Sequence, residues 1–173
     1  MKLTFKNDTF KILQIADTQE GRKVSPDTLA LINAALDREE PDLVVYSGDQ
    51  IWGRGFHGDV NQVRRILKEL TAPVVERHLP FAICFGNHDR QVGLDNRAQF
   101  EIYKEIPGFI GEDTPGVDGV GNCVLEIADG DRPGYLLYLI DSHSSLKVGY
   151  DHVHQNQICL LYTSPSPRDP KTS

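Results

Sequence analysis

The chain has 173 residues, of which 39% are apolar and 25% charged, and it carries a formal net charge of −7. This is enough for one domain with its own core and is typical of a soluble globular protein. The sequence shows no membrane-spanning apolar run, no secretory signal and no clustered basic surface for nucleic acid. Three cysteines without metal-type spacing fit a reducing cytoplasm. We expect a cytoplasmic domain without membrane or nucleic-acid partners, and the oligomeric state stays open.

The first part of the chain predicts a strand, a helix and a second strand. Residues 9–16, TFKILQIA, form an apolar run that predicts a strand ending at Asp17. Ser25-Pro26-Asp27 predicts a helix start, because it combines a capping hydroxyl, a proline and an acid. Residues 43–46 predict a short buried strand that ends close to Asp49. A strand, helix and strand in about forty residues indicate parallel pairing with a right-handed crossover.

The next part of the chain predicts another helix and a third strand. Apolar residues recur at helical spacing over 60–70, and Pro73 is expected to interrupt this helix before a shorter piece reaches His78. Residues 81–85 predict a buried strand that runs into Gly86-Asn87-His88-Asp89. Parallel strands bring their carboxyl ends to one edge of the sheet, which is where open α/β folds bind ligands.

The remaining elements are a helix and a pair of strands. Residues 96–106 predict a third helix, while 122–127 and 135–140 predict neighbouring strands joined by a turn at 129–131. The second of these strands ends at Asp141-Ser142-His143. Its end supplies one more imidazole beside a strand terminus.

Three of the predicted turns carry hard oxygen donors. Asp17, Asp49 and Asn87 are expected to meet at one sheet edge, where carboxylates without cations would repel each other. Such a cluster favours a pair of divalent metals, with Asp49 on the central turn as a bridge. His88 would then stabilise phosphoryl oxygens or protonate a leaving group, and Asp89 could fix its tautomer. An ordinary polar loop is the plain alternative for an isolated GNHD.

This constellation resembles the calcineurin-like metallophosphoesterase family. The family motifs D-x-H, G-D and G-N-H-D correspond to Asp17-Thr18-Gln19, Gly48-Asp49 and residues 86–89, and the resemblance covers residues 10–158. The stretches LLYLIDSHS and GYDHVHQNQI are similar to the branch related to purple acid phosphatases. The resemblance implies an α/β fold of the layered metallophosphoesterase type, with βαβ units and a central mixed sheet, truncated at its C-terminal side. It also implies hydrolysis of a phosphomonoester or phosphodiester as substrate.

The resemblance further implies roles for individual residues. The implied metal donors for two divalent ions (Mn²⁺, Fe²⁺ or Zn²⁺) are Asp17, Gln19, Asp49 and Asn87. His88 would act on the phosphate, with Asp89 orienting it, and both are the implied catalytic residues. Gln19 stands where the family has a histidine, and a glutamine carbonyl is a weaker ligand. This departure favours the main alternative, a non-catalytic relative that binds a metal or a phosphate ligand.

Other histidines and Arg90 receive separate interpretations. His143 follows a strand end and can face the site, whereas His152 and His154 have H-x-H spacing but no strand to deliver them. The residues interpreted as lying on the surface are His57 and His78. Arg90 could contact a phosphate or a surface acid. A nucleotide-binding module is disfavoured, because no Gly-rich phosphate loop follows the first strand.

The end of the chain has a different character. Residues 1–158 are expected to be the N-terminal part of a phosphoesterase domain, and residues 159–173 a non-native tail. Residues 159–169, CLLYTSPSPRD, match a translated frame of a transposase sequencing adapter residue for residue. A disordered tail is the alternative. On the adapter interpretation, the histidine ligands that the family carries further along the chain are missing.

Overall fold

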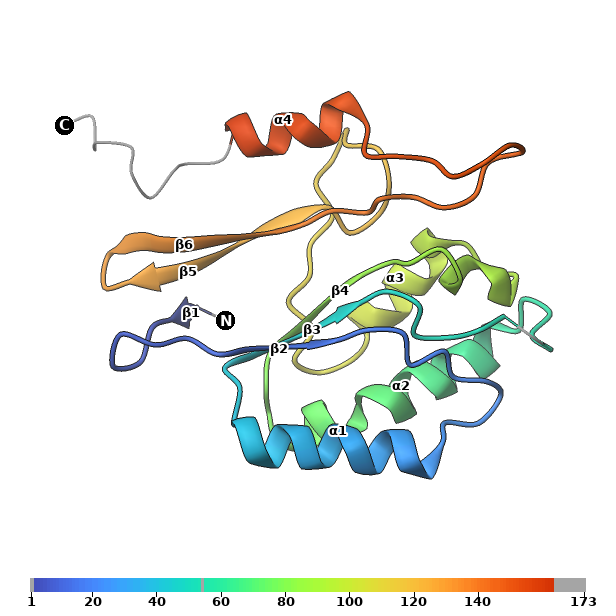
Figure 1. Ribbon diagram of the computed structural model, residues 1–173, viewed down its shortest axis with the longest axis horizontal. Coiled ribbons are helices and arrows are strands. Elements are labelled where there is room, and N and C mark those ends of the chain that lie inside the picture. The colour runs from blue at the N-terminus through green and yellow to red at the C-terminus, as the bar shows by residue number, and fades with distance from the viewer. Residues whose placement is uncertain (1, 54, 164–173) are drawn as a thin grey trace.

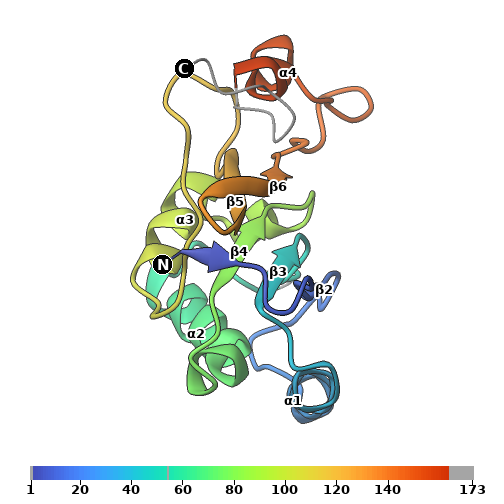
Figure 2. The same ribbon diagram turned by 90° about the vertical axis from the view of Figure 1, so that its left-hand side faces the viewer.

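The computed structural model describes residues 2–53 and 55–163. The strands are β1 (Leu3–Thr4), β2 (Ile12–Ile15), β3 (Leu43–Ser47), β4 (Phe81–Cys84), β5 (Cys123–Asp129) and β6 (Arg132–Leu139). The helices are α1 (Pro26–Glu39), α2 (Val60–Glu76), α3 (Asn96–Lys104) and α4 (Gln155–Thr163), with a short 3₁₀ helix η1 (Asp89–Val92). Helices α1 and α2 cover one face of the β2-β3-β4 sheet, and the sheet formed by β1, β5 and β6 covers the other (Figures 1 and 2). The predicted α/β layered class is confirmed.

The β2-β3-β4 sheet is parallel throughout, as the βαβ pattern predicted. Its side chains alternate between two cores, since successive residues of a strand face opposite sides. In β3, Val44 and Tyr46 pack in the core shared with the helices, and Leu43 and Val45 pack between the two sheets. Both faces of the central strand are therefore buried, and its carboxyl end lies between the ends of β2 and β4.

Helix α1 starts where the sequence predicted. Ser25 is its N-cap, and the Ser25 hydroxyl accepts a hydrogen bond of 3.2 Å from the backbone N–H of Asp27. The helix ends at Glu39, and Glu40 adopts a left-handed conformation before Pro41. Its apolar face fixes the path of the chain from β2 back to β3.

The predicted interruption of the second helix is wrong, because α2 runs through Pro73 without a break. Proline in a helix interior costs about 3 kcal/mol. Burial offsets this cost, since seven side chains of α2 are buried, Leu67 and Leu70 among them, and each large one contributes about 1.5–3 kcal/mol. The Tyr46 hydroxyl also donates to the carbonyl of Leu70, and Arg77 donates to that of Pro73. Tertiary packing therefore overrides the local preference for a break.

The second sheet has the order β1-β5-β6 and contains both kinds of pairing. The predicted antiparallel pair β5-β6 is confirmed, and the two-residue strand β1, which the sequence did not predict, pairs parallel with β5. The mixed pairing that the family resemblance implied lies in this sheet. Cys123 and the half-buried Cys84 pack between the sheets, and burial raises the pKa of Cys84 to about 11.

Helix α4 includes the first residues of the segment that the sequence analysis interpreted as non-native. It includes Cys159, and Leu160 is buried. Residues 164–173 lie outside the described residues, so the adapter interpretation stays a prediction. Within 2–53 and 55–163, no helix has both the length and the apolar character that crossing a membrane requires.

Candidate active site

The turns that follow β2 and β3 lie side by side and are joined through their backbones. The N–H of Asp17 donates to the carbonyl of Gly48 at 3.1 Å, and the N–H of Gln19 donates to that of Asp49 at 2.9 Å. Asp17, Gln19 and Asp49 all have positive φ, at 54°, 45° and 55°. Left-handed backbone is uncommon for residues other than glycine and is often found where function constrains the chain.

The turns after β3 and β4 approach each other more closely than side chains would permit. A Cβ atom added to Gly48, whose φ is +108°, would lie 2.8 Å from the Cα of Gly86. A Cβ added to Gly86 would overlap Oδ1 of Asp49 and lie 2.6 Å from its backbone nitrogen. Both glycines are therefore required for the Asp49 carboxylate to sit against the turn that carries Asn87 and His88.

Asp89 holds these two turns together. Its side chain is 2% exposed, and Oδ2 accepts hydrogen bonds from the N–H groups of Gly86 and Asp49 at 2.8 and 2.9 Å. Oδ1 accepts from Gln50 at 2.9 Å and more weakly from Ile51 at 3.4 Å. Burial raises the pKa of Asp89, while these backbone hydrogen bonds act in the opposite direction. Both oxygens are thus directed at main-chain amides rather than at a neighbouring imidazole.

Asp49 and His88 are linked through the backbone of His88. The N–H of His88 donates to Oδ1 of Asp49 at 2.8 Å, and Asp49 is 8% exposed. Among the described residues, none donates to the second oxygen of Asp49. The Nδ1 atom of His88 is buried and has no hydrogen-bond partner among the residues that the structure describes. The predicted tautomer-fixing contact from Asp89 is not formed.

The side chains near these turns are of the type that binds divalent cations, but there are fewer of them than a complete metal site needs. Asp17, Asp49 and Asn87 offer hard oxygens, and the buried amide of Gln50 has neither its oxygen nor its nitrogen paired within the described residues. However, nowhere in residues 2–53 and 55–163 do three His, Cys, Asp or Glu side chains gather as a metal-binding group. Asp17 and Gln19 are exposed, and Asp17 lines a groove along β2 and α1.

Asn87 faces a different cleft, of about 420 Å³. One wall comes from the ends of β3 and β4, including Ser47 and Gly86, and the other comes from residues within 142–153. His143 and His152 both line this second wall. The structure therefore places two imidazoles on the cleft that holds a predicted metal donor.

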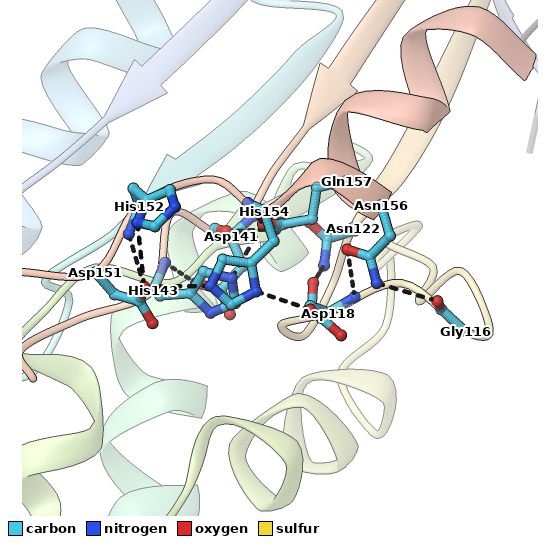
Figure 3. Close-up of polar contacts among 10 residues, drawn as sticks. All are labelled: Gly116, Asp118, Asn122, Asp141, His143, Asp151, His152, His154, Asn156 and Gln157. Atoms are coloured by element: carbon cyan, nitrogen blue, oxygen red, sulfur yellow. Dashed lines mark hydrogen bonds and ion pairs between the residues drawn. The ribbon is translucent and has the colours of Figure 1, made fainter.

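His143 belongs to a polar network beneath that wall (Figure 3). Its ring stacks on the ring of His154 at a centroid distance of 4.3 Å, and its Nε2 lies 3.0 Å from Oε1 of Gln157. The two ring nitrogens of His154 lie 2.7 Å from Asp118 and 3.2 Å from Asp151. The hydrogen bond to Asp118, followed by that to Asp151, raises the pKa of His154. Both ring nitrogens of His154 thus have carboxylate partners among the described residues.

Comparison with known proteins identifies the kind of site that this edge represents. The family model for calcineurin-like phosphoesterases matches residues 10–158. The chain belongs to the calcineurin-like phosphoesterase family. The predicted family is therefore confirmed, and the turns described above are the sheet-edge turns of a phosphoesterase domain.

Individual relatives agree with the family and with the predicted branch. Phosphatase DCR2 of Saccharomyces cerevisiae is 31% identical over 176 residues, which cover 86% of this chain and 30% of the yeast protein. Probable inactive purple acid phosphatase 14 of Arabidopsis thaliana is 27% identical over 191 residues, or 90% of this chain and 47% of the plant protein. Phosphodiesterase YaeI of Escherichia coli is 34% identical over 100 residues, or 54% and 34%. The chain thus spans less than half the length of these relatives.

Two residues at this edge and in the network beside it had no counterpart among the sequence predictions. Sequence reasoning had no signal for the unpaired amide of Gln50 or for Gln157, because their surroundings come from distant segments. The strand end before His143 was a usable signal. The guanidinium of Arg90 donates to the backbone carbonyl of Ser145 rather than to a surface acid among the described residues, and its contact with a phosphate stays a prediction. His57 and His78 are exposed, as predicted.

Proposed function

We propose that this domain hydrolyses a phosphomonoester or a phosphodiester with two divalent metal ions. The observation that carries the proposal is the junction of three strand-end turns around Asp49. The turn after β2 donates to the backbone carbonyls of Gly48 and Asp49, and the Asp49 carboxylate lies against Gly86 and the N–H of His88 in the turn after β4. The names of the relatives, a phosphatase and a phosphodiesterase, support both ester classes. Because the chain spans less than half of these proteins, the activity of the whole protein is part of the proposal.

Each predicted donor has a place in this scheme. Asp17, with Gln19, would hold one ion, Asn87 the other, and Asp49 would contact both. Bound divalent ions supply a water of lowered pKa and offset negative charge on the phosphoryl group. The chain itself positions the Asp49 carboxylate through the backbone N–H of His88 and through the amides that Asp89 holds.

The ring of His88 is the group proposed to act on the ester. Its buried Nδ1 has no partner among the described residues, so the imidazole is not committed to a structural hydrogen bond through that atom. A positioned imidazole can donate a proton to the departing oxygen or a hydrogen bond to the phosphoryl group. The backbone N–H of His88 remains with Asp49 in either case.

A non-catalytic relative that binds a metal or a phosphate ligand is the second candidate. Gln19 favours it, and so does the printed name of the plant relative, a probable inactive phosphatase. Metal binding is compatible with both candidates, whereas only the first predicts turnover.

The test combines metal binding with hydrolysis. Calorimetric titration of the whole protein uses Mn²⁺, which is the first ion to try at an oxygen-rich site. We expect a binding signal in the wild type and its loss in Asp49→Ala. The control Asp59→Ala, at the N-cap of α2, should keep the signal. Aryl phosphate and bis-aryl phosphate are then assayed with the whole protein and with the chain as written. We expect turnover in the whole protein and negligible turnover in this chain. Turnover that persists after complete chelation would contradict the proposal, and metal binding without turnover would favour the second candidate.

A further inference from the structure

The hydrogen bonds around Gln157 determine the tautomer of His143. The backbone N–H of His154 can only donate, and it lies 2.7 Å from Oε1 of Gln157. The carbonyl of Asp141 can only accept, and it lies 2.6 Å from Nε2 of Gln157. These two contacts fix the orientation of the amide, so Nε2 of His143 must donate to Oε1 at 3.0 Å.

A neutral His143 therefore carries its proton on Nε2 and its lone pair on Nδ1. No described residue occupies Nδ1, while stacking on His154 and the bond to the fully buried Gln157 hold the ring in place. His143 is also one of the residues with left-handed backbone, at φ +65°. An imidazole held in this way presents a fixed hydrogen-bond acceptor.

The cleft that His143 lines combines apolar residues, among them Phe85 and Val153, with polar groups, and it is poor in positive charge. Hydroxyl groups come from Ser142, Ser144 and Tyr150, and imidazole from His152, while Asp151 adds a carboxylate. No lysine or arginine is among the described residues that line it. The imidazole of His154 already lies 3.2 Å from Asp151, and the described lining residues leave no lysine or arginine to offset further phosphates of a leaving group. An uncharged polyol, in contrast, would find hydrogen-bond partners on this wall.

We propose that His143 is a substrate-binding residue whose Nδ1 accepts a hydrogen bond from a hydroxyl of the leaving group. The substrate is then a phosphate ester of an uncharged, hydroxyl-bearing alcohol, with the phosphate toward Asn87 and the alcohol against residues 142–153. This inference rests on the proposed function, because it takes the Asn87 edge as the phosphate site. To that function it adds the chemical class of the leaving alcohol and the residue, His143, that recognises this alcohol.

The test measures binding to the full chain in the presence of Mn²⁺, with glycerol 1-phosphate, inorganic phosphate and pyrophosphate as probes. The variant is His143→Gly, since glycine tolerates left-handed backbone and has no side-chain acceptor. The control is His57→Gly, at an exposed position outside the cleft. Imidazole ¹⁵N NMR of the metal-free wild type reports the tautomer and any change at Nδ1.

We expect glycerol 1-phosphate to bind the wild type about fivefold more tightly than inorganic phosphate, the effect of one net hydrogen bond. His143→Gly should remove this preference without changing phosphate binding, and His57→Gly should keep it. A proton on Nδ1, a preference for pyrophosphate, no binding of any probe, or an unchanged preference in His143→Gly would overturn the inference. Polyol preference without hydrolysis of any ester would retain it and refute only the proposed catalysis.

Discussion

Replacing Asp89 with asparagine tests what holds the turns after β3 and β4 together. The carboxylate is 2% exposed and accepts four backbone hydrogen bonds, from Gly86, Asp49, Gln50 and Ile51. Asparagine has nearly the same shape but only one acceptor oxygen. Its amide nitrogen must therefore face N–H donors on one side, whichever way it is oriented.

The less costly orientation keeps the two short bonds on one oxygen. With the amide oxygen toward Gly86 and Asp49, the N–H of Gln50 loses its 2.9 Å partner and that of Ile51 its 3.4 Å partner. A buried donor left without an acceptor costs about 1–3 kcal/mol. The long bond from Ile51 counts at about 1 kcal/mol, the low end of that range, so the two losses together cost about 2–4 kcal/mol. A neutral side chain is easier to bury, and burial does raise the pKa of Asp89. We therefore expect a net destabilisation of about 1–3 kcal/mol.

Urea unfolding followed by the fluorescence of Trp52 and by circular dichroism measures this difference. Asp59→Asn is the matched control, because it removes the same charge from an N-cap where asparagine and aspartate serve equally well. The control should change the unfolding free energy by less than about 0.5 kcal/mol. Equal stability of the two variants would refute the reasoning. If Asp89→Asn instead lost turnover while its stability and Mn²⁺ affinity were unchanged, Asp89 would have the catalytic role that the sequence suggested.

Three further changes probe the site and the histidine network. His88→Asn should lower kcat of the whole protein by about 10²–10⁴-fold with its metal content retained, and metal loss measured by elemental analysis would contradict this division of roles. Gln19→His should tighten the weaker Mn²⁺ site in calorimetry, because imidazole is a better ligand than an amide oxygen; an unchanged affinity would place position 19 outside the donor set. The hydrogen bonds to Asp118 and Asp151 raise the pKa of His154 in the folded protein. Protonated His154 therefore stabilises the fold fully at pH values below 6.5, its ordinary pKa, as long as both carboxylates stay ionised. This stabilisation is lost as the pH rises through the pKa of His154 in the folded state. The difference in urea stability between wild type and His154→Gln should therefore shrink between about pH 5.5 and pH 9 and with added salt, and a constant difference would contradict it.

The elements that the sequence predicted well are those defined by local patterns. Strands β3 and β4 are apolar runs that end at glycine and polar residues, and α1 begins at a capping sequence, so their positions required no knowledge of distant segments. Parallel pairing followed from the helices between the strands. The convergence of the turns carrying Asp17, Asp49 and Asn87 was therefore predictable as topology.

What could not be predicted depends on contacts between distant residues. Strand β1 has two residues and exists because it pairs with β5 more than a hundred positions later. Helix α2 continues through Pro73 with its apolar side chains buried against the sheet and with the hydroxyl of Tyr46 bonded to the carbonyl of Leu70. Neither feature leaves a signal in the neighbouring sequence, so local propensity gave no strand in one case and a false break in the other.

The role of Asp89 shows the same limit within the site. Its position next to His88 suggested a carboxylate–imidazole pair, whereas its partners are amides as far as 40 positions away along the chain. The GNHD segment consequently positions Asp49 in two ways, through the carboxylate of Asp89 and through the backbone N–H of His88. Neither contact uses the His88 ring. Because substitution of that ring leaves its N–H in place, chemistry and metal positioning can be separated at a single residue, which is why His88→Asn and Asp49→Ala are expected to differ in metal content.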